Sequence, residues 1–464
     1  MTTDITGRVA PADRAAAGRA ARKRVPPAEQ GGFTPASGRA DPVALITAQD
    51  EDRLPDLVPI RHGRMVASPF AFYRGGAVVM AADLASAPSS GLTAQLCGDA
   101  HLSNFGMFAS PERRLVFDVN DFDETAAGPW EWDLKRLLAS LTLAGRGNGF
   151  KHKDCSGIVL TAALAYREAM TSFAGMGELD VWYAHADVDD LATQLGKAQR
   201  KLLDAAGAKA RTRDSLQASR KLTAVVDGRL RIVADPPLLI PVRDLLPEAV
   251  FQEHEAQIRE ILRGYRDTLP DDRRRLLDAF EFVDLARKVV GVGSVGTRCW
   301  IALMTGRDHT DALLLQVKEA GLSVLETSAP STTRDNHGRR VVQGQRLMQA
   351  VSDIFLGWQR VPGFDGRERD FYVRQLRDWK GSVAVDALDT ETLRQYGRLC
   401  AWTLARAHAR SGDRIAIAAY LGTDDRYDQA FAAFAEAYAD QTEQDHAAFA
   451  AAIADGRLAA RVGI

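Results

Sequence analysis

Two short stretches of the chain carry side chains whose types and spacing suit phosphoryl transfer. In the first stretch, Asn104 follows Asp99 by five positions. In the second, Asp121 and Asp123 come after a short apolar run. Phosphoryl transfer needs a carboxylate that orients the attacking hydroxyl and accepts its proton, together with oxygen ligands for Mg²⁺. Asp99 is therefore the candidate catalytic base. The candidate metal ligands are Asn104, Asp121 and Asp123.

A glycine-rich segment far downstream supplies groups that could hold the phosphates of a nucleotide. Residues 291–296, Gly-Val-Gly-Ser-Val-Gly, match G-x-G-x-x-G, which occurs in dinucleotide-binding folds and in kinases. A dinucleotide-binding loop opens a helix, whereas residues 299–304 are typical of a strand, so the flanks favour the kinase type of loop. A lysine ends the next apolar strand, where a phosphate-pairing lysine belongs. The candidate nucleotide-binding residues here are Gly291, Gly293, Ser294, Gly296 and Lys318.

The acidic partner of Lys318 is less well defined by the sequence. Glu326 and Glu319 are both candidates, and Glu326 is included among the candidate nucleotide-binding residues. The helix expected near Arg340 has Gln343 at the position where a glutamate would pair with Lys318. The ion pair of Lys318 therefore stays open between two glutamates.

The elements that must position the acidic stretches can be read from local patterns. A strand over residues 92–96 leads to the first stretch, a hairpin around residues 115–119 leads to the second, and residues 130–144 form an apolar helix. A serine N-cap followed by proline predicts a further helix from Ser68 to Ala85. The expected order around the site is strand, loop, hairpin and helix.

Changes in composition along the chain predict five segments. Residues 1–40 are rich in Ala, Arg, Gly and Pro without apolar periodicity and are expected to form a disordered tail. Residues 41–150 carry the catalytic loop, and residues 151–285 form a helical subdomain. Residues 286–380 form a small β-lobe, and residues 381–464 a helical segment that completes the large lobe.

Composition and charge limit the class of protein. The 464 residues are 46% hydrophobic, and 59 Lys+Arg nearly balance 61 Asp+Glu, so no general basic field favours nucleic acid or an anionic membrane. The four cysteines form no CxxC pair, and no apolar run has the length of a transmembrane helix. We expect a cytoplasmic protein that binds neither nucleic acid nor membrane, and the oligomeric state stays open.

The acidic stretches resemble the catalytic core of aminoglycoside and choline phosphotransferases, which carry H-G-D-x-H-x-x-N, I-D-F/W-x-D and G-x-x-x-x-D-L. The matching residues here are 97–104, 119–123 and 128–134, with Cys97 in place of the loop histidine. The chain after about residue 50 also resembles a bacterial family, domain of unknown function twenty-two fifty-two.

This resemblance implies an α+β, two-lobed protein-kinase-like fold with a helix-rich C-lobe and a small antiparallel β N-lobe. The C-lobe motifs precede the N-lobe motifs, so the fold would be circularly permuted, which is tolerable where the termini lie close. It also implies that Asp133 holds the catalytic loop from behind. The implied cofactors are ATP and Mg²⁺.

Three functions on one site follow as hypotheses. The first is an ATP- and Mg²⁺-dependent phosphotransferase acting on a hydroxyl of an unidentified small molecule. The second is a nucleotide-binding pseudokinase without transfer, and the third is an AMP transferase. A metallohydrolase using Asp99, His101, Asp118 and Asp121 is disfavoured, because such sites usually gather more histidines.

Overall fold

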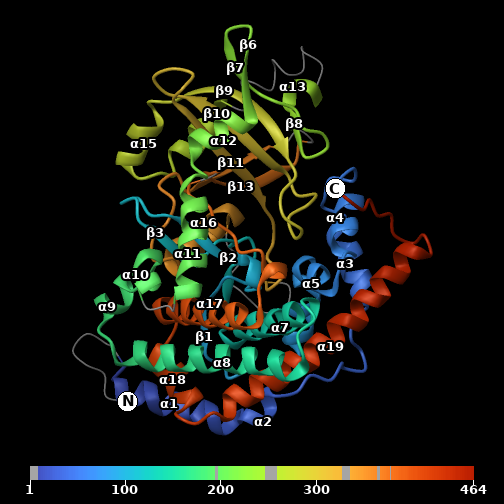
Figure 1. Cartoon of the computed structure of the whole chain (residues 1–464), viewed down its shortest axis with the longest axis vertical. Coiled ribbons are helices and arrows are strands. Elements are labelled where there is room, and N and C mark those ends of the chain that lie inside the picture. Colours follow the sequence, from blue (N-terminus) through green and yellow to red (C-terminus); the bar gives the residue numbers. More distant parts are fainter. Residues whose placement is uncertain (1–8, 194–196, 246–258, 327–334, 363–365, 377) are drawn as a thin grey trace.

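A large antiparallel sheet stands above a layer of long helices in the computed structural model (Figure 1). The structure describes residues 9–193, 197–245, 259–326, 335–362, 366–376 and 378–464. The chain therefore has the mixed α+β architecture with small antiparallel sheets that was expected from its sequence.

The helices of the lower region pack around one extensive apolar core. Helix α7 lies at its centre, and α8, α17 and α19 pack against α7. The helices with at least six residues are α1 (Pro11–Arg24), α3 (Pro42–Asp50), α4 (Val58–Met65), α5 (Pro69–Gly75), α6 (Ala77–Ala85), α7 (Glu131–Gly147), α8 (His152–Gly175), α9 (Glu178–Tyr183), α10 (Val188–Thr193), α11 (Lys197–Arg211), α12 (Ser215–Leu222), α15 (Asp271–Leu277), α16 (His337–Met348), α17 (Thr390–Ser411), α18 (Arg414–Leu421) and α19 (Arg426–Ala454). The shorter helices are α2 (Pro27–Gln30), η1 (Leu102–Asn104), α13 (Val242–Leu245) and η2 (Val385–Ala387).

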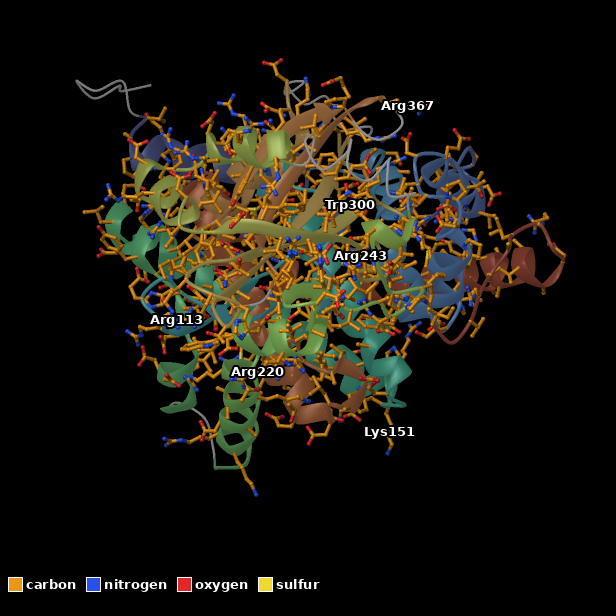
Figure 2. The ribbon with its side chains drawn as sticks, turned by 90° about the horizontal axis from the view of Figure 1, so that it is seen from above. Arg113, Lys151, Arg220, Arg243, Trp300 and Arg367 are labelled. Atoms are coloured by element: carbon orange, nitrogen blue, oxygen red, sulfur yellow. The ribbon has the colours of Figure 1, made fainter. Side chains whose placement is uncertain are left out.

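Six strands form the upper sheet in the order β12-β13-β11-β10-β9-β8, with every neighbouring pair antiparallel. From above, these strands run across the molecule, with Trp300 of β10 near the middle of the view (Figure 2). The strands are β8 (Leu239–Pro241), β9 (Glu281–Lys288), β10 (Cys299–Thr305), β11 (Ala312–Ala320), β12 (Gly357–Pro362) and β13 (Glu368–Gln375).

Strand β11 begins with a continuous apolar run, residues 312–315, because both of its faces are covered there. Leu313 and Leu315 pack into one apolar cluster, whereas Ala312 and Leu314 pack into another on the opposite face. Successive side chains of a strand point to opposite faces, so a strand covered on both sides loses the usual alternation of apolar and polar residues. Lys318, near the end of the strand, is buried as well.

The smaller sheets frame the acidic stretches. Strand β1 pairs with β4, and the loop that follows β1 contains Asp99. Strands β2 and β3 form the expected hairpin, and β3 leads to Asp121. The bounds are β1 (Thr93–Leu96), β2 (Phe105–Ala109), β3 (Leu115–Val119), β4 (Ala126–Pro129), β5 (Ala186–Asp187), β6 (Thr223–Val226) and β7 (Arg229–Ile232).

The prediction of a disordered tail over residues 1–40 is wrong for the described residues 9–40; residues 1–8 lie outside the described ranges. Helix α1 packs against α18 through small residues: Ala21 is buried, and a Cβ on Gly18 would lie 2.1 Å from the carbonyl oxygen of Ala416. Close helix packing through Gly and Ala needs no large apolar side chains. The segment therefore shows no apolar periodicity although it is folded.

Two further boundaries differ from the expectation. The helix expected from Ser68 to Ala85 is two helices, α5 and α6, because Gly76 leaves the helical conformation with φ −106° and ψ 34°. The boundary expected at residue 286 falls inside β9, and β8 adds a strand from within the segment expected to be helical. Part of that segment, residues 194–196 and 246–258, lies outside the described residues. Within the described ranges, no helix has the length and apolar character needed to cross a membrane.

Candidate active site

A cavity of about 860 Å³ lies where the upper sheet meets the loops that follow β1 and β3. It brings together residues from both predicted halves of the site, although the halves are nearly two hundred positions apart in sequence. The predicted site residues that line it are Asp99, Asn104, Asp121, Asp123, Gly291, Gly293, Ser294 and Lys318. Two predicted residues, Gly296 and Glu326, are not part of its wall.

The carboxylate of Asp99 is held in a defined position. Arg136 Nε donates to Asp99 Oδ1 at 2.6 Å, and His101 Nε2 lies 3.6 Å from Oδ2. Asn104 Nδ2 donates to the backbone carbonyl of Asp99 at 2.7 Å, which closes the loop on itself. Gly98 has φ +84°, and a Cβ there would lie 2.1 Å from the carbonyl oxygen of Glu124, so the turn before Asp99 requires glycine.

Asp133 holds this loop from behind, as the resemblance implied. Its carboxylate accepts hydrogen bonds from the backbone N–H groups of Cys97 at 2.8 Å and Gly98 at 3.0 Å. His408 Nε2 lies 3.3 Å from the same carboxylate, and His408 Nδ1 lies 2.8 Å from the hydroxyl of Tyr166. All of these groups are buried, so a polar network inside the core fixes the backbone beside Asp99.

Lys318 points at the second acidic stretch. Its Nζ makes a close ion pair with Asp123 Oδ2 and lies 3.7 Å from Asp121 Oδ2. The Tyr372 hydroxyl donates to Asp123 Oδ1 at 2.7 Å, and Ser294 Oγ of the glycine loop donates to Asp123 Oδ2 at 3.2 Å. Sheet, glycine loop and acidic stretch therefore meet at one carboxylate.

The charges in this cluster stabilise each other. Burial would raise the pKa of Asp121, but the positive charges of Lys318 and Arg374 outweigh it and lower that pKa to about 2. Burial would lower the pKa of Lys318, but Asp121 and Asp123 raise it well above its ordinary value. Both partners are therefore charged at neutral pH, which leaves acidic oxygen and positive charge side by side in the cavity.

Neither glutamate proposed as the partner of Lys318 has that role. Glu326 lies 3.7 Å from Arg340 and 4.0 Å from His337, while Glu319 pairs with Arg298 and Arg369. Gln343 of α16 is exposed, whereas Arg340 of the same helix is buried. The guanidinium of Arg340 donates to the carbonyl oxygens of Asp123, Thr125 and Gly321 and thereby anchors the second acidic stretch.

The glycine loop joins β9 to β10 without opening a helix, as its flanks predicted. It is held by the N-terminal part of the chain: the N–H of Leu54 donates to the carbonyl oxygen of Gly296 at 2.8 Å, and Arg64 donates to that of Val290 at 2.6 Å. Gly296, at φ +92°, packs on the side chain of Arg53. The side chain of Arg53 thus covers Gly296, which is not part of the cavity wall.

Several arginines at the site carried no recognisable signal in the sequence. Arg374 of β13 lines the cavity, donates to the carbonyl oxygen of Asn120 at 3.0 Å and donates to Gln316 Oε1 at 3.1 Å. Arg53 and Arg74 line the wall next to the glycine loop. Arg74 is a single charge within an apolar segment, whereas Arg53 and Arg374 lie among other charged residues, and only the tertiary structure brings these charges to the cavity.

The donor set suits a hard cation held together with phosphates. Asn104, Asp121 and Asp123 offer amide and carboxylate oxygens, which Mg²⁺ prefers, and it is usually bound by one or two carboxylates plus substrate phosphates. Among the described residues, no three His, Cys, Asp or Glu side chains converge as a preformed metal centre. The oxygen atoms of these three side chains are the kind of ligand that a hard divalent cation takes.

Of the comparisons with known proteins, only the one with family models gives a match. No curated protein matches it, and no solved structure matches it. A family model described as "Uncharacterized protein conserved in bacteria (DUF2252)" matches residues 53–452, which include every predicted site residue. The chain belongs to the bacterial family DUF2252.

Proposed function

We propose that the protein is an ATP- and Mg²⁺-dependent phosphotransferase that acts on a hydroxyl of a small molecule. One observation carries the proposal: Lys318 Nζ lies 3.7 Å from Asp121 Oδ2 in the same cavity that Asp99 and the glycine loop line. A phosphate-binding cation, a metal-binding carboxylate and a candidate base are thus within reach of one triphosphate. These are the parts that phosphoryl transfer requires.

The arrangement of elements supports a two-lobed, circularly permuted kinase-like fold as part of this proposal. The glycine loop joins β9 and β10, Lys318 lies on the adjacent strand β11, and helix α16 follows. Kinases use the same series of parts: a glycine-rich loop, a lysine on the third strand and a helix after it. The loop containing Asp99 comes earlier in the chain and meets this sheet across the cavity.

The chain's own residues have separate roles in the proposed reaction. Asp99 orients the acceptor hydroxyl and accepts its proton as the oxygen attacks the terminal phosphorus, whose bond to the bridging oxygen breaks and releases ADP. Lys318 neutralises charge on the phosphate oxygens, and the glycine loop covers them. Mg²⁺, held by Asn104, Asp121 and Asp123, would supply further charge neutralisation when bound. Asp133 and Arg136 keep Asp99 in position through the contacts described above.

Labelled ATP tests this proposal. Purified protein is incubated with Mg²⁺, a metabolite extract and ATP carrying label at either the α- or the γ-phosphate. Transfer of γ-label by the wild type, lost in Asp99→Asn and Lys318→Ala, is the expected result. Transfer of α-label instead identifies an AMP transferase, and equal behaviour of all three proteins contradicts the assignment.

One observation favours a nucleotide-binding protein without transfer as the second candidate. Arg136 already occupies Oδ1 of Asp99 at 2.6 Å, and Asp123 is engaged by Lys318, Tyr372 and Ser294. A pseudokinase would keep these contacts on binding ATP. Tight Mg²⁺-dependent ATP binding with no labelled product from any extract would support this candidate.

A further inference from the structure

The wall of the cavity next to the glycine loop contains a cation to which the proposed reaction assigns no role. Arg74, in helix α5, lines the cavity and is largely shielded from solvent. Its backbone carbonyl lies next to the glycine loop, since a Cβ on Gly293 would be 3.3 Å from that oxygen. Its Nε is buried and has no hydrogen-bond partner among the described residues.

The neighbouring buried arginines differ from Arg74 because each has defined acceptors. Arg136 donates to Asp99 and to the carbonyl oxygen of Tyr73, and Arg340 donates to three backbone carbonyls. Arg374 donates to Asn120 and Gln316. Burying a guanidinium without such acceptors costs free energy, because the group loses its hydrogen bonds to water. Arg74 therefore has capacity for an anion that enters the cavity.

Two charged groups, Asp99 and Arg64, act on Arg74. Asp99 faces it but already pairs with Arg136, and Arg64 adds a like charge. Burial lowers the pKa of His101 to about 4, so this imidazole is neutral at pH 7. No described carboxylate makes an ion pair with Arg74.

Arg74 and Lys318 interact with different carboxylates of the cavity. Lys318 contacts Asp121 and Asp123, the candidate metal ligands, whereas the carboxylate that acts on Arg74 is that of Asp99, the candidate base. The anion at Lys318 is the nucleotide's phosphate in the proposed reaction. The anion at Arg74 must then lie near the hydroxyl that Asp99 orients.

We propose that Arg74 binds a carboxylate or phosphate group of the acceptor, so that the substrate class is a small hydroxyl-bearing anion. This inference rests on the proposed phosphotransferase function. It departs from the acceptors of the enzymes that the motifs resemble, since choline and aminoglycosides are cations. Arg74 determines specificity in this account, and Asp99 remains the catalytic residue.

Matched acceptors test the proposal at saturating Mg-ATP. Glycerol 3-phosphate, glycerate and 3-phosphoglycerate are compared with glycerol, choline and ethanolamine as acceptors of γ-label. We expect transfer to at least one of the three anions and, in Arg74→Met, a KM for it raised roughly 10- to 100-fold, the loss typical of one charge-assisted contact. Arg74→Lys should restore part of this loss, and Arg457→Ala, at an exposed residue, should behave as the wild type.

Two outcomes overturn the inference while leaving the phosphotransferase intact. One is transfer to the neutral or cationic alcohols alone. The other is an Arg74→Met defect that is equal for every acceptor and for hydrolysis by water, which would place Arg74 on the donor phosphate.

If no label is transferred to any acceptor, the proposed function fails, and a binding measurement then tests the anion site by itself. Calorimetry with the same three anions and Mg-ADP should then still show binding to the wild type at least about tenfold tighter than to Arg74→Met. Equal or absent binding to both proteins overturns the anion site as well.

Discussion

The two halves of the candidate site are held in place by different kinds of contact. The loop containing Asp99 is fixed by buried side chains, namely Asp133, Arg136 and, behind them, His408. The glycine loop is fixed at its backbone by residues of the N-terminal helices, such as Arg64. The first half belongs to the main core, whereas the glycine loop packs through Val295 into a small apolar cluster with Leu57 and Ile60.

The contacts that hold each half indicate which half of the site can move. Hydrogen bonds to charged groups contribute about 1.5–3 kcal/mol each, and leaving a buried group unsatisfied adds its own cost. Local opening draws on regions with few buried contacts. We therefore expect the base to stay fixed while the glycine loop opens to admit a nucleotide.

The largest expected effect comes from Asp99→Asn, which removes the base and keeps the shape of the side chain. Loss of a positioned general base slows proton transfer by roughly 10²- to 10⁴-fold. Initial rates of γ-label transfer measure the effect, and urea unfolding monitors the fold. A variant that retains more than a tenth of the wild-type rate would show that Asp99 is not the base.

Asp133→Ala tests whether the core fixes the loop. The N–H groups of Cys97 and Gly98 lose their acceptor, and each unsatisfied buried donor costs about 1–3 kcal/mol, so the free energy of unfolding should fall by about 2–4 kcal/mol. Asp133→Asn, which keeps one acceptor oxygen, should lose less. Equal stability of Asp133→Ala and the wild type in urea titrations would remove the basis of the comparison.

The sequence was sufficient for the local elements of both halves. Strands β10 and β11, the hairpin of β2 and β3 and helix α7 follow from apolar runs and alternation, and the glycine loop follows from its spacing. Helix α1 could not be predicted in this way, because its contact with α18 uses Gly18 and Ala21 rather than large apolar side chains. The broken helix at Gly76 depends on a single backbone conformation.

The acidic partner of Lys318 could not be predicted from local sequence patterns. Lys318 had several acidic candidates, and its partner, Asp123, lies 195 positions away in the chain. Which carboxylate meets a lysine depends on how the sheet docks on the helical region, and no spacing encodes this docking. The same reason hides Arg74, Arg136 and Arg340, whose roles depend on neighbours from other segments.

The pH dependence of stability sharpens the comparison for the buried half. Burial lowers the pKa of His101 to about 4, below the value near 6.5 expected for the unfolded chain. Between these values the unfolded chain binds a proton that the folded protein does not, so stability falls as the pH drops from about 6.5 to 4. The loss attributable to His101 approaches ~3 kcal/mol, and urea titrations at pH 7 and 4.5 measure it. His101→Gln should show a smaller decline, and an identical decline would contradict the buried neutral state.

The smallest expected effect concerns the anchor of the glycine loop. Arg64→Ala removes the bonds to the carbonyl oxygens of Val290 and Ile464, each worth about 1 kcal/mol. The KM for ATP should rise several-fold while the thermal midpoint changes little, because the loop and not the core is released. The exposed Arg457→Ala serves as the control, and a large loss of stability in Arg64→Ala would place the loop in the core after all.

The central claim is that two distant halves of the chain form one nucleotide site. A crystal structure with Mg²⁺ and a non-hydrolysable ATP analogue tests it most directly. We expect the phosphates to contact Lys318 and the metal to bind Asp121 and Asn104. Asp99 should face the terminal phosphate. A nucleotide bound outside this cavity, or bound without contact to Lys318 and Asp121, would contradict the account.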